Sequence, residues 1–347
     1  MVAGRRMSRH RTIRANRRLS AVLPHLLSAA ATGSHSCSIP GQITRLVRLP
    51  LICPMPTVHD IDKHTERRFA VSATSANRLV DLPSALDGKV VIPDDSRFDD
   101  ARRAFNLAVD QRPWAVVCPE SARDVAAVVR WARESGQQVT AQTTGHNASP
   151  LGSLQNTILL KTERMRQVSV DPVARTARVE AGVIWIEVLE AAAPHELAPL
   201  SGSSPNVGVA GYVLGGGISF LGRKYGLSAN RVCAIELVTA DGRLVRADFE
   251  HEQDLFWALR GGGGSFGIVT AIEVELFPVK EVYAGILWYP VERESEVLHA
   301  WRNLTLSERL PDDLTTIGRF LNFPSFPELS SFAVLGCGDH RSIRGPA

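Results

Sequence analysis

The chain has 347 residues, 44% hydrophobic and 22% charged, which is ordinary for a globular protein with room for two domains. Seven arginines in the first eighteen residues hide a net charge of −4 in the rest of the chain, so we expect no nucleic acid partner. No stretch reaches the length of a membrane-spanning helix, and the five cysteines form no CxxC pair. We therefore expect no membrane partner and a cytoplasmic location.

Residues 1–59 contain no Asp or Glu, which is typical of a targeting peptide. Arg17-Arg18 ahead of an apolar run suggests twin-arginine export, but Pro24 interrupts that run and no strong consensus surrounds the pair. The alternative is a disordered extension or an upstream start, with Met55 as the other start. We favour the basic, disordered extension and expect the folded chain to begin at residue 60.

The first folded segments predict a β-α-β unit. Ser121 is a good N-cap and Gly136 a good helix end, and valines recur between them at helical spacing. Strands on either side of this helix indicate a small parallel sheet. The elements expected here are a helix over 98–109, a strand over 114–119, a helix over 121–136 and a strand over 139–142.

The second of these strands runs into Thr143-Thr144-Gly145-His146-Asn147. A turn that follows a strand and contains Gly and hydroxyl residues can present backbone N–H groups to a diphosphate. One histidine in a loop is by itself more often a surface or structural residue.

Turn signals separate the next elements, and Asp241-Gly242 between two apolar runs predicts a β-hairpin. We expect strands over 158–160, 168–170, 177–179, 232–239, 244–247 and 268–276, and helices over 184–193 and 254–260.

Residues 201–227 are rich in glycine and contain almost no charge before Arg223. Apolar residues lie between the glycines, so the segment is not a flexible linker, which would be polar. A glycine-rich run that still packs predicts a chain lying against a large, flat cofactor.

Gly262, Gly264 and Gly267 match the G-x-G-x-x-G spacing of dinucleotide sites. That motif requires a strand before it and a helix after it, whereas here the helix precedes and the strand follows. We therefore reject an NAD site.

Three motifs, TTGHN, GSSPNVGVAGYVLGGG and DLFWALRGGGGSFGIVT, occur in this order. Together they resemble the vanillyl-alcohol oxidase / p-cresol methylhydroxylase flavoproteins, in the branch of the berberine-bridge enzyme and 6-hydroxynicotine oxidase. The resemblance covers about 112–278. It implies an α+β fold, with a two-subdomain FAD-binding domain of the p-cresol methylhydroxylase type over 60–280, divided near residue 175, and an incomplete substrate domain over 281–347.

The resemblance also implies the site. The turn 143–147 would hold the diphosphate, and His146 matches a histidine that many members link covalently to the flavin; the alternative is a hydrogen-bonding histidine beside non-covalent FAD. The residues expected to bind FAD are Thr143, Thr144, Gly145, His146, Asn147, Ser204, Gly208, Val209, Gly211, Tyr212, Gly215, Gly216, Gly217, Gly267, Ile268 and Val269. We expect no metal.

Two positions refine this expectation. Doubly linked members carry a cysteine where this chain has Ser204, and a hydroxyl is a poorer nucleophile than a thiolate, so we expect no cysteinyl link. In relatives, a small residue at the position of Val209 is associated with access of oxygen to the flavin, which favours an oxidase.

The stretch from 281 begins like the family's substrate domain, with the apolar run Ala284 to Pro290 followed by a helix-like pattern at Val297, Leu298, Trp301 and Leu304. Residues 334–347 show no periodicity, and the family's C-terminal segment, which in many members supplies the catalytic base, has no counterpart. The catalytic residues thus stay unassigned. Two interpretations follow: an FAD-dependent oxidase of an alcohol, sugar or amine that uses oxygen, or a truncated flavin-binding fragment or pseudo-enzyme without turnover.

Overall fold

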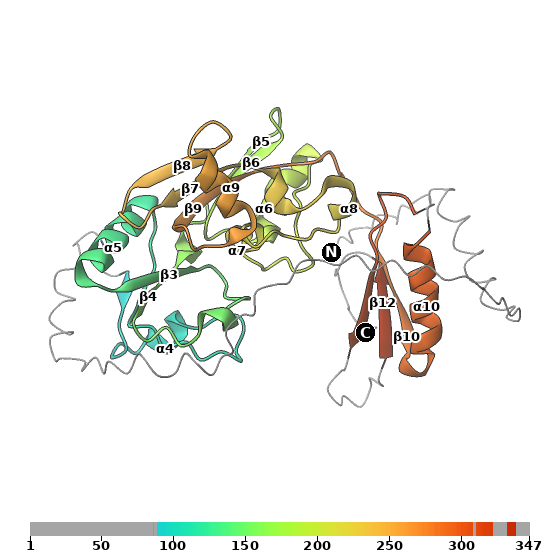
Figure 1. Ribbon diagram of the computed structural model, residues 1–347, viewed down its shortest axis with the longest axis horizontal. Helices are drawn as coiled ribbons and strands as arrows, with labels where there is room; N and C mark the ends of the chain where they lie inside the picture. Colours follow the sequence, from blue (N-terminus) through green and yellow to red (C-terminus); the bar gives the residue numbers. More distant parts are fainter. Residues whose placement is uncertain (1–85, 87–88, 308–309, 322–331, 338–347) are drawn as a thin grey trace, which may run out of the picture. The chain divides into compact units, whose positions relative to one another are not determined.

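The computed structural model describes Leu86 and residues 89–307, 310–321 and 332–337 (Figure 1). The predicted extension over 1–59, its export signal, the alternative start at Met55 and the domain start at residue 60 lie outside the described residues.

The first sheet forms around the predicted β-α-β unit. Its strand order is β1-β2-β4-β3, and both β2 and β3 pair in parallel with β4, so β4 separates the two strands predicted from the sequence. Strand β1 is antiparallel to β2. The strands are β1 (Val90–Val91), β2 (Ala115–Val117), β3 (Gln138–Gln142) and β4 (Thr157–Lys161).

Helix α5 (Ala122–Ser135) connects β2 to β3, and both of its predicted ends are confirmed. The Ser121 hydroxyl accepts a hydrogen bond from the Asp124 N–H at 3.2 Å, which satisfies one of the free donors of the first turn. Gly136 ends the helix in the left-handed conformation at φ 70°. The buried face of α5 packs against the sheet through Val125 and Val128.

The helix predicted over 98–109 is wrong in its length, because α4 covers only Phe98–Ala101. Beyond it the backbone bonds to other elements. The Arg103 carbonyl accepts a hydrogen bond from Lys161, and the Phe105 N–H donates to the Thr144 carbonyl at 2.8 Å. Helical continuation would have required both backbone groups.

The second sheet is antiparallel throughout, in the order β5-β6-β9-β7-β8. Its strands are β5 (Val168–Asp171), β6 (Thr176–Glu180), β7 (Val232–Val238), β8 (Leu244–Asp248) and β9 (Ile268–Glu275). The expected subdomain division near residue 175 is wrong, because β5 already belongs to this sheet as the hairpin partner of β6. The Asp171 carboxylate fixes the turn by accepting from the Val173 and Ala174 N–H groups.

Four helices accompany this sheet: α6 (Trp185–Ala192), α7 (Val209–Leu214), α8 (Gly222–Tyr225) and α9 (Gln253–Gly262). Buried side chains of α6, α7 and α9 form one hydrophobic core with β6, β7 and β9. Short 3-10 helices complete the two sheets: η4 (Ser149–Leu151), η5 (Thr162–Arg164), η6 (Ala193–His195) and η7 (Ser228–Arg231).

The last described stretch forms an antiparallel sheet of its own, in the order β10-β12-β11. It comprises β10 (Gly285–Pro290), η8 (Val291–Arg293), α10 (Glu294–Thr305), β11 (Ile317–Leu321) and β12 (Phe332–Cys337), and α10 lies against β10 and β12. The expectation of no regular pattern from 334 onward is wrong for 334–337, where the chain pairs with strands on both sides; 338–347 lie outside the described residues. Within the described ranges, no helix is long and apolar enough to cross a membrane.

Candidate functional site

The turn over 143–147 directly follows β3. Two of its carbonyls are hydrogen-bonded, whereas most of its N–H groups have no acceptor among the described residues. The Thr144 and Gly145 carbonyls accept hydrogen bonds from the Phe105 and Asn106 N–H groups at 2.8 and 3.4 Å. The N–H groups of Thr144 to Asn147 have no protein acceptor in the part of the chain that the structure describes. Successive unpaired N–H groups in a turn form a concavity that attracts anions.

Gly145 allows this turn to exist. Its φ is +80°, and a Cβ there would lie 2.7 Å from the Ala104 Cβ and 2.9 Å from the Gln142 Cδ. Any L residue would therefore meet both a strained backbone and a steric clash.

His146 is held by stacking. Its ring lies on the Phe105 ring, with centroids 3.7 Å apart and planes inclined by 20°. Its Nε2 is buried and has no hydrogen-bond partner among the described residues. A buried ring nitrogen without a partner is unusual, since such groups are normally satisfied.

Contacts of Thr143 join the turn to the glycine-rich segment. Its hydroxyl donates to the Ala181 carbonyl at 2.7 Å and lies 3.0 Å from the Thr162 hydroxyl. A Cβ on Gly208 would lie only 2.8 Å from the Thr143 Cβ. The first two motifs therefore meet where α7 begins.

Helix α7 has one apolar face and one bare face. Val209 and Val213 are fully buried in the core of the second sheet. Gly211 and Gly215, one helical turn apart, are exposed, and a Cβ on Gly211 would meet nothing within 4 Å. The helix therefore presents backbone alone on its outer face. Val209 can contribute only backbone to that face, because its side chain points into the core.

Tyr212 supports the glycine segment from inside. Its ring fits between Gly202 and Gly217, where added Cβ atoms would lie 2.8 and 2.6 Å from ring carbons, and it meets the Trp185 ring edge-on at 5.3 Å. The Tyr212 hydroxyl lies near Ser228 but forms no hydrogen bond with the described residues. Burial raises the pKa of the Tyr212 hydroxyl. Gly216 and Gly217 take φ of +105° and +73°, so the chain turns sharply here.

Ser204 lies in the loop before α7, where its hydroxyl donates to the Asn206 side-chain oxygen at 3.0 Å. No hydrogen bond between Ser204 and the 143–147 turn occurs within the described ranges.

The third motif packs on the other two. The Gly263 N–H donates to the Leu214 carbonyl at 3.0 Å, which ties the end of α9 to the end of α7. Gly267 has a φ of +153°, and a Cβ there would lie 2.6 Å from the Val238 carbonyl oxygen. Ile268 and Val269 then start β9 beside the end of β7. The motif follows α9 and precedes β9, the order on which an NAD site was rejected.

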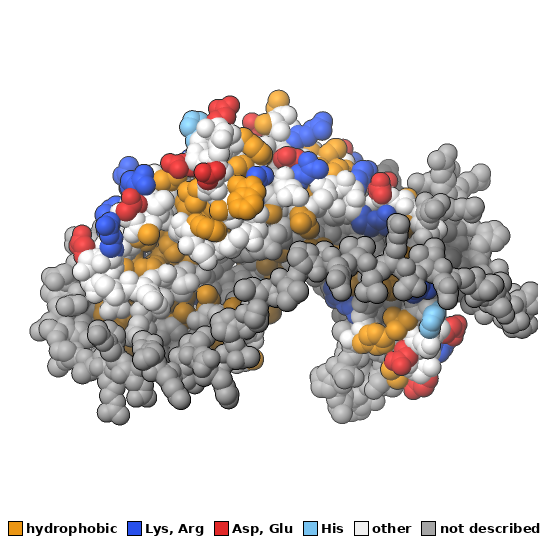
Figure 2. All heavy atoms as spheres, viewed as in Figure 1, with side chains coloured by type: hydrophobic (Ala, Val, Ile, Leu, Met, Phe, Trp, Pro, Cys, Tyr) orange, Lys and Arg blue, Asp and Glu red, His pale blue; other side chains and the backbone are white. Residues whose placement is uncertain are grey.

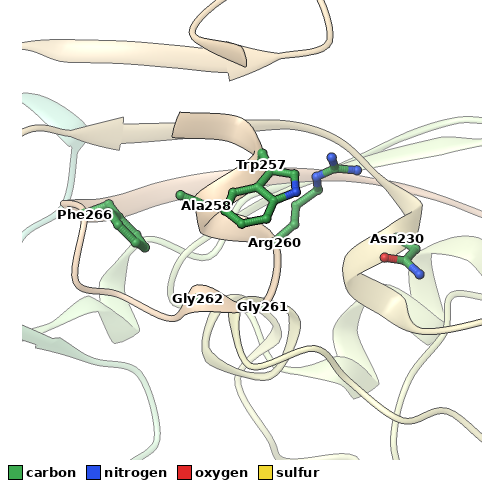
Figure 3. A pocket seen from close by; sticks show the side chains of 7 residues that line it. All are labelled: Asn230, Trp257, Ala258, Arg260, Gly261, Gly262 and Phe266. Carbon is green, nitrogen blue, oxygen red and sulfur yellow. The ribbon is translucent and has the colours of Figure 1, made fainter. Parts of the chain in front are cut away.

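Two cavities lie elsewhere. One of about 360 Å³ is bounded by the outer side of α9 and its kinked end, where hydrophobic side chains gather on the surface (Figures 2 and 3). It is lined by Asn230, Trp257, Ala258, Arg260, Gly261, Gly262 and Phe266. The other, of about 430 Å³, lies beside β3. Neither is lined by residues 143–147 or by α7.

Sequence reasoning missed a buried polar group beneath the turn, formed by Lys161, Gln142 and Gln111, which are 5%, 6% and 1% exposed. The available signal was a lysine that ends an otherwise apolar, buried strand, Thr157–Lys161.

Comparison with known proteins identifies the class. Residues 113–248 match the FAD binding domain family, and this part of the chain is an FAD-binding domain. The chain is 36% identical to (R)-6-hydroxynicotine oxidase of Paenarthrobacter nicotinovorans over 210 residues, which are 60% of this chain and 46% of the relative. It is 37% identical to glucooligosaccharide oxidase of Sarocladium strictum over 182 residues, 52% of this chain and 36% of that protein.

Among solved structures, BBE-like 1 of Physcomitrella patens superimposes with a TM-score of 0.64 at 26% identity, over 76% of this chain and 56% of that one. Residues 113–248 form an FAD-binding domain, so the cofactor is FAD, and the homologues and structural neighbours of the chain are 6-hydroxynicotine oxidase and berberine-bridge-enzyme-like FAD oxidoreductases. It spans about half the length of the curated relatives that it matches.

Proposed function

We propose that the chain is the FAD-binding part of an FAD-dependent oxidase, with an FAD-binding domain over 60–280 and the start of a substrate domain over 281–347. Two of the relatives with named activities are oxidases, one of (R)-6-hydroxynicotine and one of glucooligosaccharides. We accordingly propose an amine, alcohol or sugar as substrate and oxygen as acceptor.

The observation that carries this proposal is the set of N–H groups from Thr144 to Asn147 that no described residue accepts from. A diphosphate is doubly charged and accepts several hydrogen bonds, so it fits such a turn. The Thr144 and Gly145 carbonyls are bonded to the Phe105 and Asn106 N–H groups, which reduces their repulsion of the anion.

The bare face of α7 fits a flat ring system, because Gly211 and Gly215 let the ring approach the backbone. Gly208 lies between this face and the turn. We propose that the ring and its chain lie along Ser204, Gly208, Val209, Gly211, Tyr212 and Gly215 to Gly217, and that Gly267, Ile268 and Val269 bracket the adenine.

Bound FAD would supply the acceptor for a hydride from a substrate C–H bond. The contribution of these residues is to bind and orient it: the turn holds the charge, α7 supports the ring and the stacked His146 is held beside them.

To test the function, the protein loaded with FAD is mixed without oxygen with alcohols, sugars and cyclic amines while the flavin absorbance is followed, and peroxide is measured after air is admitted. Bleaching and peroxide with at least one class are expected. Absence of both with every class would contradict the proposal.

We expect His146 to carry FAD covalently, because its Nε2 has no partner among the residues that the structure describes and its ring is oriented by Phe105. Acid precipitation should leave a yellow pellet for the parent and a colourless pellet for His146→Ala. The variant should still bind FAD reversibly, because the turn binds through backbone groups. His195→Ala, at an exposed histidine of η6, is the matched control and should keep the yellow pellet. A colourless parent pellet with all FAD in the supernatant would contradict the covalent link.

Gly211→Ala should change stability and FAD binding in opposite directions. Alanine in a helix interior is favoured over glycine by about 1 kcal/mol, and the added Cβ meets nothing, so the FAD-free protein should gain stability. The same Cβ would stand on the proposed ring face, and FAD affinity should fall by about tenfold. Urea unfolding without FAD and a fluorescence titration with FAD measure the two effects. Unchanged FAD affinity would place the ring elsewhere.

A further inference from the structure

The buried polar group beneath the turn is a one-way hydrogen-bond chain. The Lys161 ammonium donates to the Gln142 Oε1 at 2.9 Å, and the Gln142 Nε2 donates to the Gln111 Oε1 at 2.9 Å. The Gln111 Nε2 then donates to the Ala148 carbonyl at 3.2 Å. An ammonium can only donate and a carbonyl can only accept, so the two ends fix the orientation of both amides.

These hydrogen-bonded residues contact the turn over 143–147 at its start, at its end and in its middle. Gln142 precedes the turn and Ala148 follows it, while a Cβ on Gly145 would collide with the Gln142 amide carbon. The Lys161 ammonium also donates to the Arg103 carbonyl at 2.9 Å. That bond holds the segment whose Phe105 and Asn106 N–H groups occupy the turn's carbonyls.

The charge on Lys161 is unusual for its position. Lys161 is 5% exposed, and no carboxylate lies within ion-pair distance of it in the described ranges. Two of its three ammonium hydrogens have acceptors, and the third has none among the described residues. Burial without a counter-ion lowers the pKa of the Lys161 ammonium, with Glu163 acting against this from farther away. A buried cation destabilises a fold unless a negative charge lies nearby.

We propose that Lys161 is a positioning residue of the flavin site. It fixes the turn over 143–147 in its anion-binding form through Gln142 and the Arg103 carbonyl, and its buried charge favours the FAD diphosphate. The proposal rests on the FAD site proposed above.

The test compares two lysines of the same sheet region, both changed to methionine, which keeps the length of the side chain and removes its charge. Lys161 has no counter-ion within the described part of the chain, whereas Lys89 is paired with Asp124 at 2.8 Å and Glu120 at 3.2 Å. Both substitutions are made in His146→Ala protein, so that FAD binds reversibly. The dissociation constant is measured by quenching of flavin fluorescence, and the melting temperature is measured without FAD.

Lys161→Met should raise the Kd of FAD by at least about tenfold, while the FAD-free melting temperature stays equal or rises, because an unpaired buried charge has been removed. Lys89→Met should lower the melting temperature, since it strands Asp124, and leave the Kd unchanged. If Lys161 were merely structural, Lys161→Met would lower the FAD affinity and the melting temperature together, and that result overturns the proposal. A Kd within twofold of the parent also overturns it.

Gln111→Leu provides a second variant in case Lys161→Met does not fold. It keeps the ammonium and breaks the chain at the Ala148 carbonyl, so the Kd should rise about threefold or more; an unchanged Kd overturns the proposal. A parent that does not bind FAD overturns the flavin site itself. If the parent binds FAD and both variants bind it with the same Kd, only the proposed role of Lys161 is overturned.

Discussion

Replacement of Gly145 by alanine should abolish FAD loading while leaving the rest of the domain folded. The alanine would have to adopt φ +80° and place its Cβ 2.7 Å from the Ala104 Cβ. The left-handed conformation alone disfavours alanine by about 1–2 kcal/mol, and the clash adds to it. The turn can relieve both only by moving, which scatters the unpaired N–H groups. We expect FAD affinity to fall by about 100-fold or more, equivalent to about 2.7 kcal/mol.

Gly136→Ala is the control, because Gly136 has nearly the same φ, +70°, and a Cβ there meets nothing within 4 Å. It should lower the free energy of unfolding by about 1 kcal/mol and leave FAD affinity unchanged. Absorbance at the flavin maximum after loading and desalting, with urea unfolding, reports both properties. Equal FAD content in the two variants would show that the turn does not bind the diphosphate.

Replacement of Gly182 by alanine should have the largest effect on folding. A Cβ there would lie 2.0 Å from the Thr162 carbonyl oxygen and 2.7 Å from that of Met165, both of them backbone atoms. Gly182 follows β6 and packs on the segment that connects the two sheets, and its N–H donates to the Met165 carbonyl at 2.8 Å. Overpacking against backbone cannot be relieved by a rotamer change, so we expect a loss of about 3 kcal/mol or more.

Gly222→Ala is the matched control, because a Cβ at Gly222 meets nothing within 4 Å and its φ lies outside the left-handed region. It should change stability by no more than about 0.5 kcal/mol. Soluble yield and the urea midpoint distinguish the two variants. A Gly182→Ala protein as stable as the parent would mean that the two sheets can separate at this junction without loss.

Local signals predicted much of the fold. The N-cap at Ser121, the C-cap at Gly136 and the Asp241-Gly242 hairpin each depend on neighbouring residues, and all three are found. The helix over 98–109 was overextended because the groups that end it, Lys161 and Thr144, are distant in sequence.

The candidate site, too, was predicted from the sequence only in part. The motif order identified the turn and the glycine segment, and the structure joins them through Thr143 and Gly208. What the residue types did not reveal was direction: the Val209 side chain points inward while Gly211 points outward. The hydrogen-bond chain from Lys161 to Ala148 involves four sequence-distant positions and has no motif.

Strand β9 is the last strand of its sheet to be synthesised, yet it lies at the centre, between β6 and β7. While the ribosome makes residues 181–267, the β5–β6 hairpin and the β7–β8 hairpin have no strand between them, and the apolar faces of α6 and α7 lack their common core. Pairings that span so much chain form slowly. We therefore expect this half of the domain to be most prone to aggregation during translation until residues 268–275 are made. The strands of the first sheet are all synthesised by residue 161, so this sheet and the turn over 143–147 can form before the second sheet does.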